Sequence, residues 1–384
     1  MNSEMKYDSR MKINMTEKTS VEKAWKAYLN KIEPADRTAM ELAKKRWNSV
    51  AKPIGSLGIL EEDIIKIAGI RGNASGMKLD RSALAVMCAD HGVVAEGVSQ
   101  TSKDVTRIVA ENFTKGETST SKMCRISGTD LYPVDMGMDC GPTGQKEPDM
   151  HRILDRKVAR GSGNIAREPA MSRTGCLQAL LSGIDLAFRL KEKGYEILAA
   201  GEMGIGNTTP AAAMSAVLTG LPPEEATGRG AGLSDQGLRR KIEVIRRAIA
   251  VNRPDPEDPL DVLSKLGGFD IAGLCGIFLG GALYGIPVLI DGVISSAAAL
   301  CAERLCPNSA KAMVASHVSQ EPASRLLLEV LGKRPLITAG MHLGEGTGAV
   351  AAIPLLDMAL AVYQGSSTFD ETGIEAYQPL GGQP

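Results

Sequence analysis

A single glutamate between glycines is the residue in this sequence that most suggests chemistry. The stretch Gly344-Glu345-Gly346-Thr347-Gly348 follows an apolar run and precedes a small-residue helical pattern that starts at Ala349. Glycine permits a sharp turn and a close approach to a ligand, because it has no Cβ atom. We expect Glu345 to project from a turn. The local pattern fits a turn that faces water as well as a turn that faces a site.

A second stretch, residues 201–210, joins an apolar run to an alanine-rich helical pattern and contains Glu202. Thr209 is the expected N-cap of that helix and Pro210 its first residue. The free N–H groups and the positive dipole end of such a helix favour a phosphate. The stretch is neither a Walker A loop nor a GxGxxG motif, so ATP and dinucleotides are not indicated. A plain strand-to-helix turn is the alternative.

A third glycine-rich turn, residues 228–232, precedes Ser234 and Asp235, either of which can cap the next helix. That helix carries Arg239, Arg240 and Lys241. Two such turns with cations nearby favour one phosphate and one sugar, with Lys241 as the candidate cation. A solvated helix face explains most of the same cations equally well.

Short apolar runs alternate with longer helical patterns, which is typical of an α/β fold with a largely parallel sheet. The runs are 83–89, 131–134, 195–200, 287–290, 312–315 and 336–339. Helical spacing also covers 21–49 and 60–71. Each apolar run is followed by polar side chains, namely Asp90-His91, Asp135, Glu202, Asp291, Ser316-His317, and His342 with Glu345. In open parallel sheets, ligands bind beyond the carboxyl ends of the strands. We therefore expect these side chains to share one site.

Composition narrows the class of protein. The 384 residues are 43% apolar and include 42 glycines, and the net charge is −1 with no basic block, so nucleic acid is not an expected partner. Seven scattered cysteines without a CxxC pair are typical of reduced thiols in a cytoplasmic protein. Residues 1–20 lack the apolar core of a signal peptide and are expected to be disordered. The uncharged stretch 271–290 is long enough to span a membrane, but its glycines and Pro287 favour a buried helix and strand.

Histidines and acids leave a metal site as an alternative. Asp90, His91, His317 and Glu345 could hold a metal in a phosphohydrolase, yet no HExxH or other close ligand spacing occurs. Asp291 follows the run 288–290 as acids do in phosphoribosyl pyrophosphate sites, but those sites usually have paired acids. No metal or cofactor is expected.

Taken together, these stretches resemble the nicotinate-nucleotide–dimethylbenzimidazole phosphoribosyltransferase family. The similarity runs in family order through most of the chain, and the matching stretches are 52–58 (KPIGSLG), 89–93 (ADHGV), 96–99 (EGVS), 201–210, 228–232, 267–272 (GGFDIA), 291–292, 316–319 (SHVS) with Glu321-Pro322, and 341–348.

The resemblance implies transfer of the phosphoribosyl group of nicotinate mononucleotide to 5,6-dimethylbenzimidazole with inversion, which gives α-ribazole 5′-phosphate and nicotinate for the nucleotide loop of cobalamin. It implies Glu345 as the general base and Glu202 as a second acid near the ribose. The implied phosphoribosyl contacts are Gly204, Gly206, Asn207, Thr208, Gly230, Lys241 and Ser319. The implied base contacts are Asp90, His91, Ser99, Lys103, Met341 and Leu343.

The resemblance also implies a cytoplasmic homodimer with a large Rossmann-like parallel α/β domain, residues 71–364, and a small helical domain from segments 21–70 and 365–384. Ser102 and Lys103 stand where many family members have Pro and Gln. Since that loop borders the base pocket, adenine, another benzimidazole or a phenol stays open as the acceptor. A non-catalytic subunit of the same fold is a further alternative.

Overall fold

Six parallel strands form the single sheet of the computed structural model, which describes residues 18–144 and 146–377. Their spatial order is β3-β2-β1-β4-β5-β6. The strands are β1 (Ser82–Ala89), β2 (Thr129–Gly137), β3 (Leu154–Asp155), β4 (Ile197–Met203), β5 (Val288–Ile290) and β6 (Met313–Ala315). The predicted parallel α/β fold is confirmed.

Five strands coincide with predicted apolar runs, whereas the predicted strand 336–339 is wrong. That run passes beside β6 and makes only one bridge, from Ile337 to His317, while Thr338 and Ala339 are exposed. The short edge strand β3 lies outside every predicted run. In both cases the strand pairing depends on residues that are distant in the sequence, so the local pattern does not determine it.

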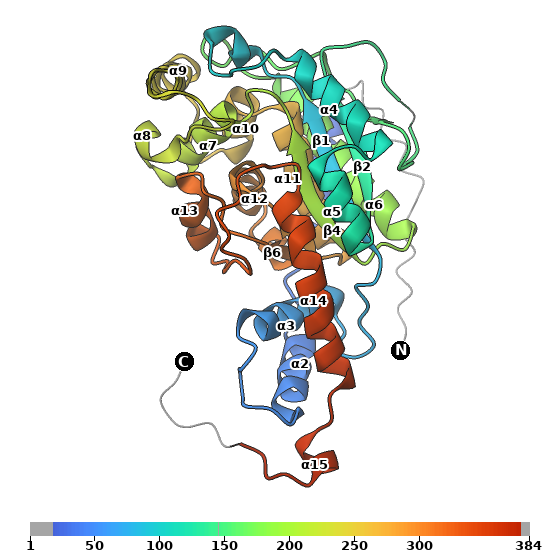
Figure 1. The fold of residues 1–384 in the computed structure, drawn as a ribbon. Helices are drawn as coiled ribbons and strands as arrows, with labels where there is room; N and C mark the ends of the chain where they lie inside the picture. Colours follow the sequence, from blue (N-terminus) through green and yellow to red (C-terminus); the bar gives the residue numbers. More distant parts are fainter. Residues whose placement is uncertain (1–17, 145, 378–384) are drawn as a thin grey trace.

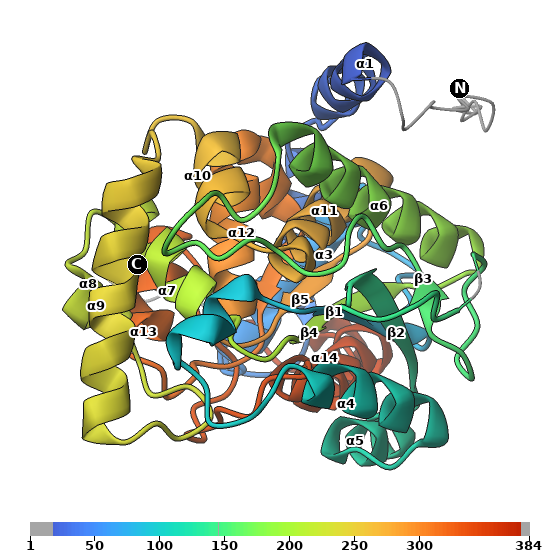
Figure 2. The same ribbon diagram turned by 90° about the horizontal axis from the view of Figure 1, so that it is seen from above.

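Alternate residues of the central strand enter two separate cores. Ala83, Ala85 and Met87 of β1 face one core, and Leu84 and Val86 face the other. This alternation of buried side chains is expected of a parallel strand covered by helices on both faces. Figure 2 shows the sheet between α6 and α11 on one side and α4, α5 and α14 on the other.

The helices divide between these two faces. Those of the first core are α1 (Lys18–Leu29), α6 (Arg173–Glu192), α7 (Thr208–Thr219), α9 (Asp235–Asn252), α10 (Pro259–Leu266), α11 (Phe269–Tyr284), α12 (Val293–Leu305) and α13 (Ala323–Val330), with α8 (Pro223–Ala226) and the 3-10 helices η1 (Gly92–Glu96) and η2 (Pro307–Ala312) beside them. Those of the second core are α2 (Arg37–Ser49), α3 (Ile59–Arg71), α4 (Asp104–Lys115), α5 (Ser119–Ser127) and α14 (Thr347–Gly365).

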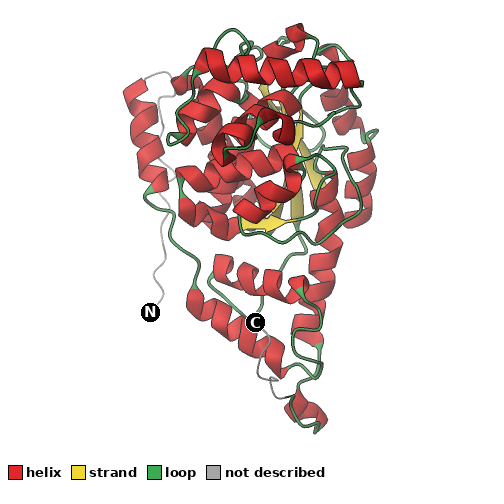
Figure 3. Cartoon of the chain, turned by 90° about the vertical axis from the view of Figure 1, so that its left-hand side faces the viewer, coloured by secondary structure: helices red, strands yellow, loops and turns green. Residues whose placement is uncertain are grey.

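A narrow helical part projects from the main body (Figures 1 and 3). It contains α2, α3, the second half of α14 and α15 (Phe369–Thr372). Within it, the ring centroids of Trp47 and Tyr363 lie 5.1 Å apart. The expected segment 21–70 is split, because α1 packs on α6 through Val21 and Trp25 rather than on α2. The boundaries of the two domains stay a prediction.

The ends of the chain can be compared with prediction only in part. The expected disordered segment 1–20 lies mostly outside the described residues, and α1 already begins at Lys18. In the predicted C-terminal segment, Thr368 forms a bridge to Val50, and Phe369 is buried. Residues 378–384 lie outside the described part of the chain.

Two long apolar segments pack within the fold, one almost fully and one in part. The stretch 271–290 forms most of α11 and then β5, and its α11 residues up to Ala282 are buried, as predicted. Among the described residues, α14 alone is long and apolar enough to cross a membrane. In the structure it packs against α3, α5 and β4, so it belongs to the second core.

Candidate active site

A cavity of about 230 Å³ lies beyond the carboxyl ends of β4 and β5. Six separate segments of the chain line it. The lining residues that the sequence singles out are Ser99, Glu202, Gly204, Gly206, Asn207, Thr208, Gly230, His317, Ser319, His342, Leu343 and Glu345. Most of the candidate site residues therefore meet in one place.

The turn that carries Glu345 is held in an unusual backbone conformation. Gly344, Glu345 and Gly346 have φ of 83°, 59° and 80°, so three consecutive residues are left-handed. The turn lies on Gly201 of β4, where an added Cβ would stand 2.9 Å from the carbonyl oxygen of Glu345. A left-handed glutamate is costly without support from its surroundings. The structure supplies that support from the end of β4.

Asp291 fixes the same turn from the end of β5. Its carboxylate accepts hydrogen bonds from the backbone N–H groups of Gly346, Gly348 and Ala349, at 3.2, 2.8 and 3.1 Å. A carboxylate at a helix N-terminus satisfies free N–H groups and complements the helix dipole. Asp291, the single acid that follows the run 288–290, thus binds the N-terminal N–H groups of α14.

The carboxylate of Glu345 lines the cavity and is partly buried. The hydroxyl of Thr120, at the start of α5, donates a 2.8 Å hydrogen bond to its Oε2. Burial raises the pKa of Glu345, hydrogen bonds from Thr120 oppose that rise, and the charge of Asp291 adds to it. A carboxyl of raised pKa beside a cavity is suited to accept a proton.

Glu202 is the second carboxyl of the cavity and is almost fully buried. Burial raises its pKa to about 8; the amide of Asn207 opposes the rise, and Asp270, Asp291 and Glu345 add to it. The Asn207 amide donates to Glu202 and also, at 3.1 Å, to Asp270. Asp270 in turn lies 3.1 Å from Nε2 of His91. Glu202 therefore heads a buried polar chain and holds its proton at neutral pH in the free protein.

Backbone groups and one buried lysine form the other side of the cavity. Asn207, not the predicted Thr209, is the N-cap of α7, and it makes no side-chain cap bond to the helix; Pro210 is the third helical residue. The helix begins at Thr208, and both Asn207 and Thr208 line the cavity. For α9 the predicted cap is confirmed, because Ser234 Oγ accepts from the N–H of Gly237 at 3.2 Å.

Lys241 lies beneath this end of the cavity rather than in its wall. Its Nζ is buried and donates to Thr208 Oγ1 at 2.8 Å and to the carbonyl of Gly228 at 3.0 Å. Burial lowers the pKa of Lys241 to about 8, and Glu321 counteracts this. Glu321 lines the cavity and accepts a 3.0 Å hydrogen bond from the N–H of Gly230. Lys241 thus holds Thr208 of the cavity wall and Gly228 at the start of the 228–232 turn.

Four predicted base-binding residues do not line this cavity. His91 is buried against Asp270, and Asp90 is buried and accepts a 2.7 Å hydrogen bond from the N–H of Asp139. Lys103 turns outward to an ion pair with Asp139. Met341 lines a neighbouring hollow that shares Leu343 with the cavity. Of the predicted base contacts, only Ser99 and Leu343 line the cavity itself.

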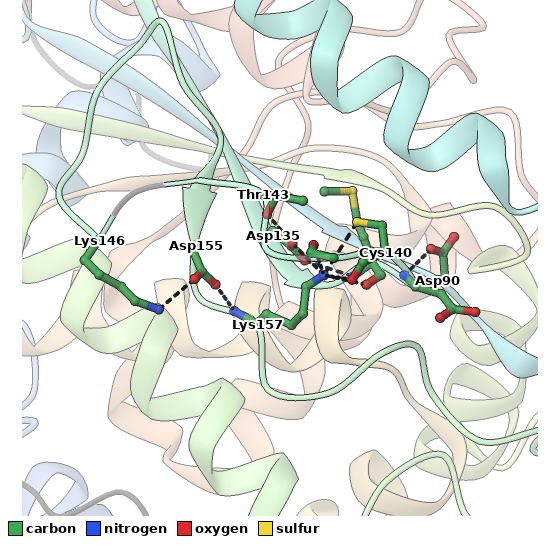
Figure 4. A network of polar contacts seen from close by, with 10 residues as sticks. Asp90, Asp135, Cys140, Thr143, Lys146, Asp155 and Lys157 are labelled. Atoms are coloured by element: carbon green, nitrogen blue, oxygen red, sulfur yellow. Dashed lines mark hydrogen bonds and ion pairs between the residues drawn. The ribbon is translucent and has the colours of Figure 1, made fainter.

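Asp135 also lies away from the cavity, in the polar network of Figure 4. Its carboxylate accepts from the N–H of Met138 at 2.8 Å and lies 3.1 Å from Nζ of Lys157. Lys157 also donates to the carbonyl of Cys140 at 2.8 Å. The expectation that every strand-end polar group shares one site is therefore wrong for Asp135, which holds the loop after β2.

The alternative metal site does not assemble from the predicted residues. His91 pairs with Asp270, whereas His317 contacts Ser316 at 3.1 Å and lies 3.9 Å from Asp291. Within residues 18–144 and 146–377, no three His, Cys, Asp or Glu side chains are grouped as metal ligands.

Sequence reasoning missed several members of the site. Gln100 and Ser295 line the cavity, Glu321 binds the 228–232 turn, and Thr120 binds Glu345. Glu321 lies in a stretch that the resemblance includes, so a signal existed for it. No local pattern distinguishes Thr120, which lies 225 residues from its partner.

Comparisons with known proteins define the class. A family model described as phosphoribosyltransferase matches residues 32–374. The protein is therefore a phosphoribosyltransferase by class. The nicotinate-nucleotide–dimethylbenzimidazole phosphoribosyltransferase of Acetivibrio thermocellus is 46% identical over 351 residues, which cover 91% of this chain and 98% of that protein. The enzyme of the same name from Escherichia coli K12 is 43% identical and covers 87% and 92% of the two chains.

A solved structure agrees with these relatives. The crystal structure of CobT from Thermus thermophilus superimposes with a TM-score of 0.82 at 40% identity, covering 88% of this chain and all of that one. The chain belongs to the nicotinate-nucleotide–dimethylbenzimidazole phosphoribosyltransferase family, as the resemblance implied.

Proposed function

We propose that this enzyme transfers the 5-phosphoribosyl group of nicotinate mononucleotide to 5,6-dimethylbenzimidazole or a related lower-ligand base. The C1–N bond to nicotinate breaks, and its electron pair stays on the pyridine nitrogen. A ring nitrogen of the acceptor forms the new bond from the opposite face, which converts β to α. The products are α-ribazole 5′-phosphate and nicotinate, for nucleotide-loop assembly in cobalamin.

The position of Glu345 carries this proposal. The acceptor azole becomes acidic as it bonds and must lose its N–H proton, whereas the pyridinium leaving group needs none. Glu345 lines the same cavity as the N-terminus of α7, so a base next to the carboxylate can face a ribose whose phosphate lies at that helix. General base catalysis of this kind contributes about 10²–10⁴ in rate.

Glu202 is assigned to the ribosyl side of the reaction. Its pKa of about 8 in the free enzyme reflects burial among other acids. A nicotinate mononucleotide carries a pyridinium charge, and the transition state spreads positive charge over the ribose. Either charge lowers the pKa of a neighbouring carboxyl, so Glu202 releases its proton to water when nicotinate mononucleotide binds and then faces the developing charge as a carboxylate.

The phosphate is assigned to Gly204, Gly206, Asn207, Thr208, Gly230 and Ser319, with Lys241 behind them. Support comes from the N-terminus of α7, which lies in the cavity wall, and from a buried ammonium whose pKa is lowered. A phosphate dianion nearby favours the charged form of Lys241. Glu321 holds the N–H of Gly230 in the ligand-free state and must release it if the phosphate takes that donor.

The acceptor base is assigned to Ser99, Met341 and Leu343, with Asp90, His91 and Lys103 as proposals that require rearrangement or an indirect role. Leu343 is 56% exposed, which leaves an apolar surface for an aromatic ring. Adenine or a phenol is the alternative acceptor, because Ser102 and Lys103, which differ from many family members, adjoin this loop.

We further propose a cytoplasmic homodimer. Sedimentation velocity tests whether the protein is a dimer.

The test is nicotinate release from nicotinate mononucleotide with 5,6-dimethylbenzimidazole, adenine or p-cresol, with and without chelator. We expect release that depends on a base and not on the chelator. Glu345→Gln should lower kcat by about 10²–10⁴ while nicotinate mononucleotide still binds. Glu225→Gln, an exposed glutamate on α8, is the matched control. Equal kcat for Glu345→Gln and the parent would refute the assignment of the base, and chelator-sensitive release would support the metal alternative.

A further inference from the structure

Thr120 is a fully buried residue whose hydroxyl reaches the carboxylate of Glu345. Its Oγ1 donates to Glu345 Oε2 at 2.8 Å, across 225 residues of sequence. Thr120 is the second residue of α5, whose N-cap is Thr118. The carboxylate therefore lies at the N-terminus of a nine-residue helix that packs along α14.

We propose that Thr120 is a positioning residue for the transferase reaction, which holds one oxygen of Glu345 and leaves the other free to take the proton of the acceptor base. This inference rests on the proposed role of Glu345. A carboxylate has two oxygens, and a hydrogen bond to Oε2 fixes the rotation of the group about its last bond. The free Oε1 can then meet a ring N–H without a search among rotamers.

The backbone of Glu345 alone does not fix the side chain. The turn 344–346 is anchored by Gly201 and by Asp291, and both contacts involve main-chain atoms. Thr120 makes the hydrogen bond to the carboxylate itself. It stands on α5, on the side of the turn that neither β4 nor β5 supplies.

The charges around Glu345 explain why such a partner is needed. The charge of Asp291, from the end of β5, adds to the rise in the pKa of Glu345, and Glu202 of β4 lines the same cavity. His317, after β6, contacts Ser316 and faces Asp291 at 3.9 Å, and His342 bonds the Gly340 carbonyl at 3.0 Å. From α5 the group facing Glu345 is the neutral Thr120. Its hydroxyl stabilises the ionised form, which is the form that acts as the base.

The experiment compares Thr120→Val, which is nearly isosteric but cannot donate, with Thr120→Ser, which restores the hydroxyl. For Thr120→Val we expect kcat to fall about tenfold with an unchanged KM for nicotinate mononucleotide. The acid limb of the kcat–pH profile should move to higher pH, because the ionised carboxylate has lost a donor. Thr120→Ser should lie close to the parent in both measurements.

Two further variants make the outcome decisive. Ser127→Ala removes a hydroxyl at the far end of the same helix, where it bonds Cys124 and Thr129, and should leave kcat and its pH profile unchanged. In a Glu345→Gln background, Thr120→Val should lower kcat by much less than in the parent, because the two residues act as one unit. Thr120→Ala replaces the valine variant if that variant does not fold.

Separate results test the role of Thr120 and the role of Glu345. If Thr120→Val keeps the parental kcat and pH profile while Glu345→Gln loses turnover, Thr120 is merely structural and this proposal is wrong. If Glu345→Gln itself keeps turnover, the proposed function of Glu345 is wrong, whatever Thr120 does.

Discussion

The two carboxyls of this cavity differ because their surroundings differ. Glu345 is partly exposed and accepts a hydrogen bond from the hydroxyl of Thr120. Burial raises its pKa, and that hydrogen bond opposes the rise. Glu202 is buried, has one amide donor and faces three other acids, and its pKa rises to about 8. The surroundings of the two acids thus differ within one site, which is the arrangement that separates a base from a stabilising group.

The burial of Glu202 predicts a pH-dependent cost in stability. Its pKa is near 4.5 in the unfolded chain and about 8 in the folded protein, so between these values the folded state binds a proton that the unfolded state has released. Protonated Glu202 therefore makes its full contribution to the stability of the folded state below about pH 4.5, and this contribution is lost as the pH rises toward 8. Glu202→Gln cannot titrate. We expect its free energy of unfolding to exceed that of the parent increasingly from pH 5 to pH 8, by no more than about 5 kcal/mol.

Urea unfolding at pH 5, 6.5 and 8 measures this difference. Glu225→Gln, which replaces an exposed glutamate, should show no trend with pH. A difference between Glu202→Gln and the parent that stays constant over the three pH values would mean that Glu202 is ionised throughout, contrary to the buried polar chain described above.

At the scale of elements, the site depends on how closely the turn 344–346 lies on β4. The carbonyl oxygen of Glu345 would stand 2.9 Å from a Cβ at Gly201, and its carbonyl carbon 3.0 Å. Backbone atoms on both sides leave no flexible side chain to move away. Gly201 is therefore the residue that lets the turn 344–346 lie against β4 and carry Glu345 to the end of the sheet.

Gly201→Ala should displace this turn without unfolding the sheet. A shift of about 1 Å at a catalytic group costs up to about 10²-fold in rate, and we expect kcat for nicotinate release to fall by about that factor. Circular dichroism should still show the parental α/β spectrum. Gly365→Ala, at an open position at the end of α14, is the matched control and should retain full activity. Parental activity in Gly201→Ala would show that the turn can move without consequence.

The sequence predicted the elements well where the signal is local. Flanking glycines marked Glu345, and continuous apolar runs marked β1 and β4, since such strands are buried on both faces. The run 336–339 has the same composition but lies at the surface beside β6, and only the tertiary structure decides that.

Polar residues after strands were less reliable guides to the site. Asp135 and Asp291 follow strands as Glu202 accompanies β4, yet they hold a loop and a helix terminus. A buried acid that satisfies backbone N–H groups and one that faces a ligand look alike in a sequence. Thr120 could not be predicted, because its role comes from the packing of α5 against α14.

For the whole molecule, α14 is the element shared by both parts. The turn just before its first residue carries Glu345 beside the sheet, and near its other end Tyr363 packs on Trp47 of α2 in the projecting helical part (Figure 1). The chain contains two tryptophans, and they lie in different cores, Trp25 against α6 and Trp47 between α2 and α14. Each core thus has its own fluorescent reporter.

We expect the projecting helical part and the main body to unfold in one cooperative transition. The reason is that α14 packs on α3 in the helical part and on β4 and α5 in the main body, so unfolding α14 removes packing from both. Single-tryptophan variants, Trp25→Phe and Trp47→Phe, allow this to be measured. In each variant, tryptophan fluorescence and far-ultraviolet circular dichroism should give the same urea midpoint. If the Trp47 signal in Trp25→Phe changes at lower urea than the circular dichroism, the projecting part unfolds first and the shared helix does not couple it to the catalytic body.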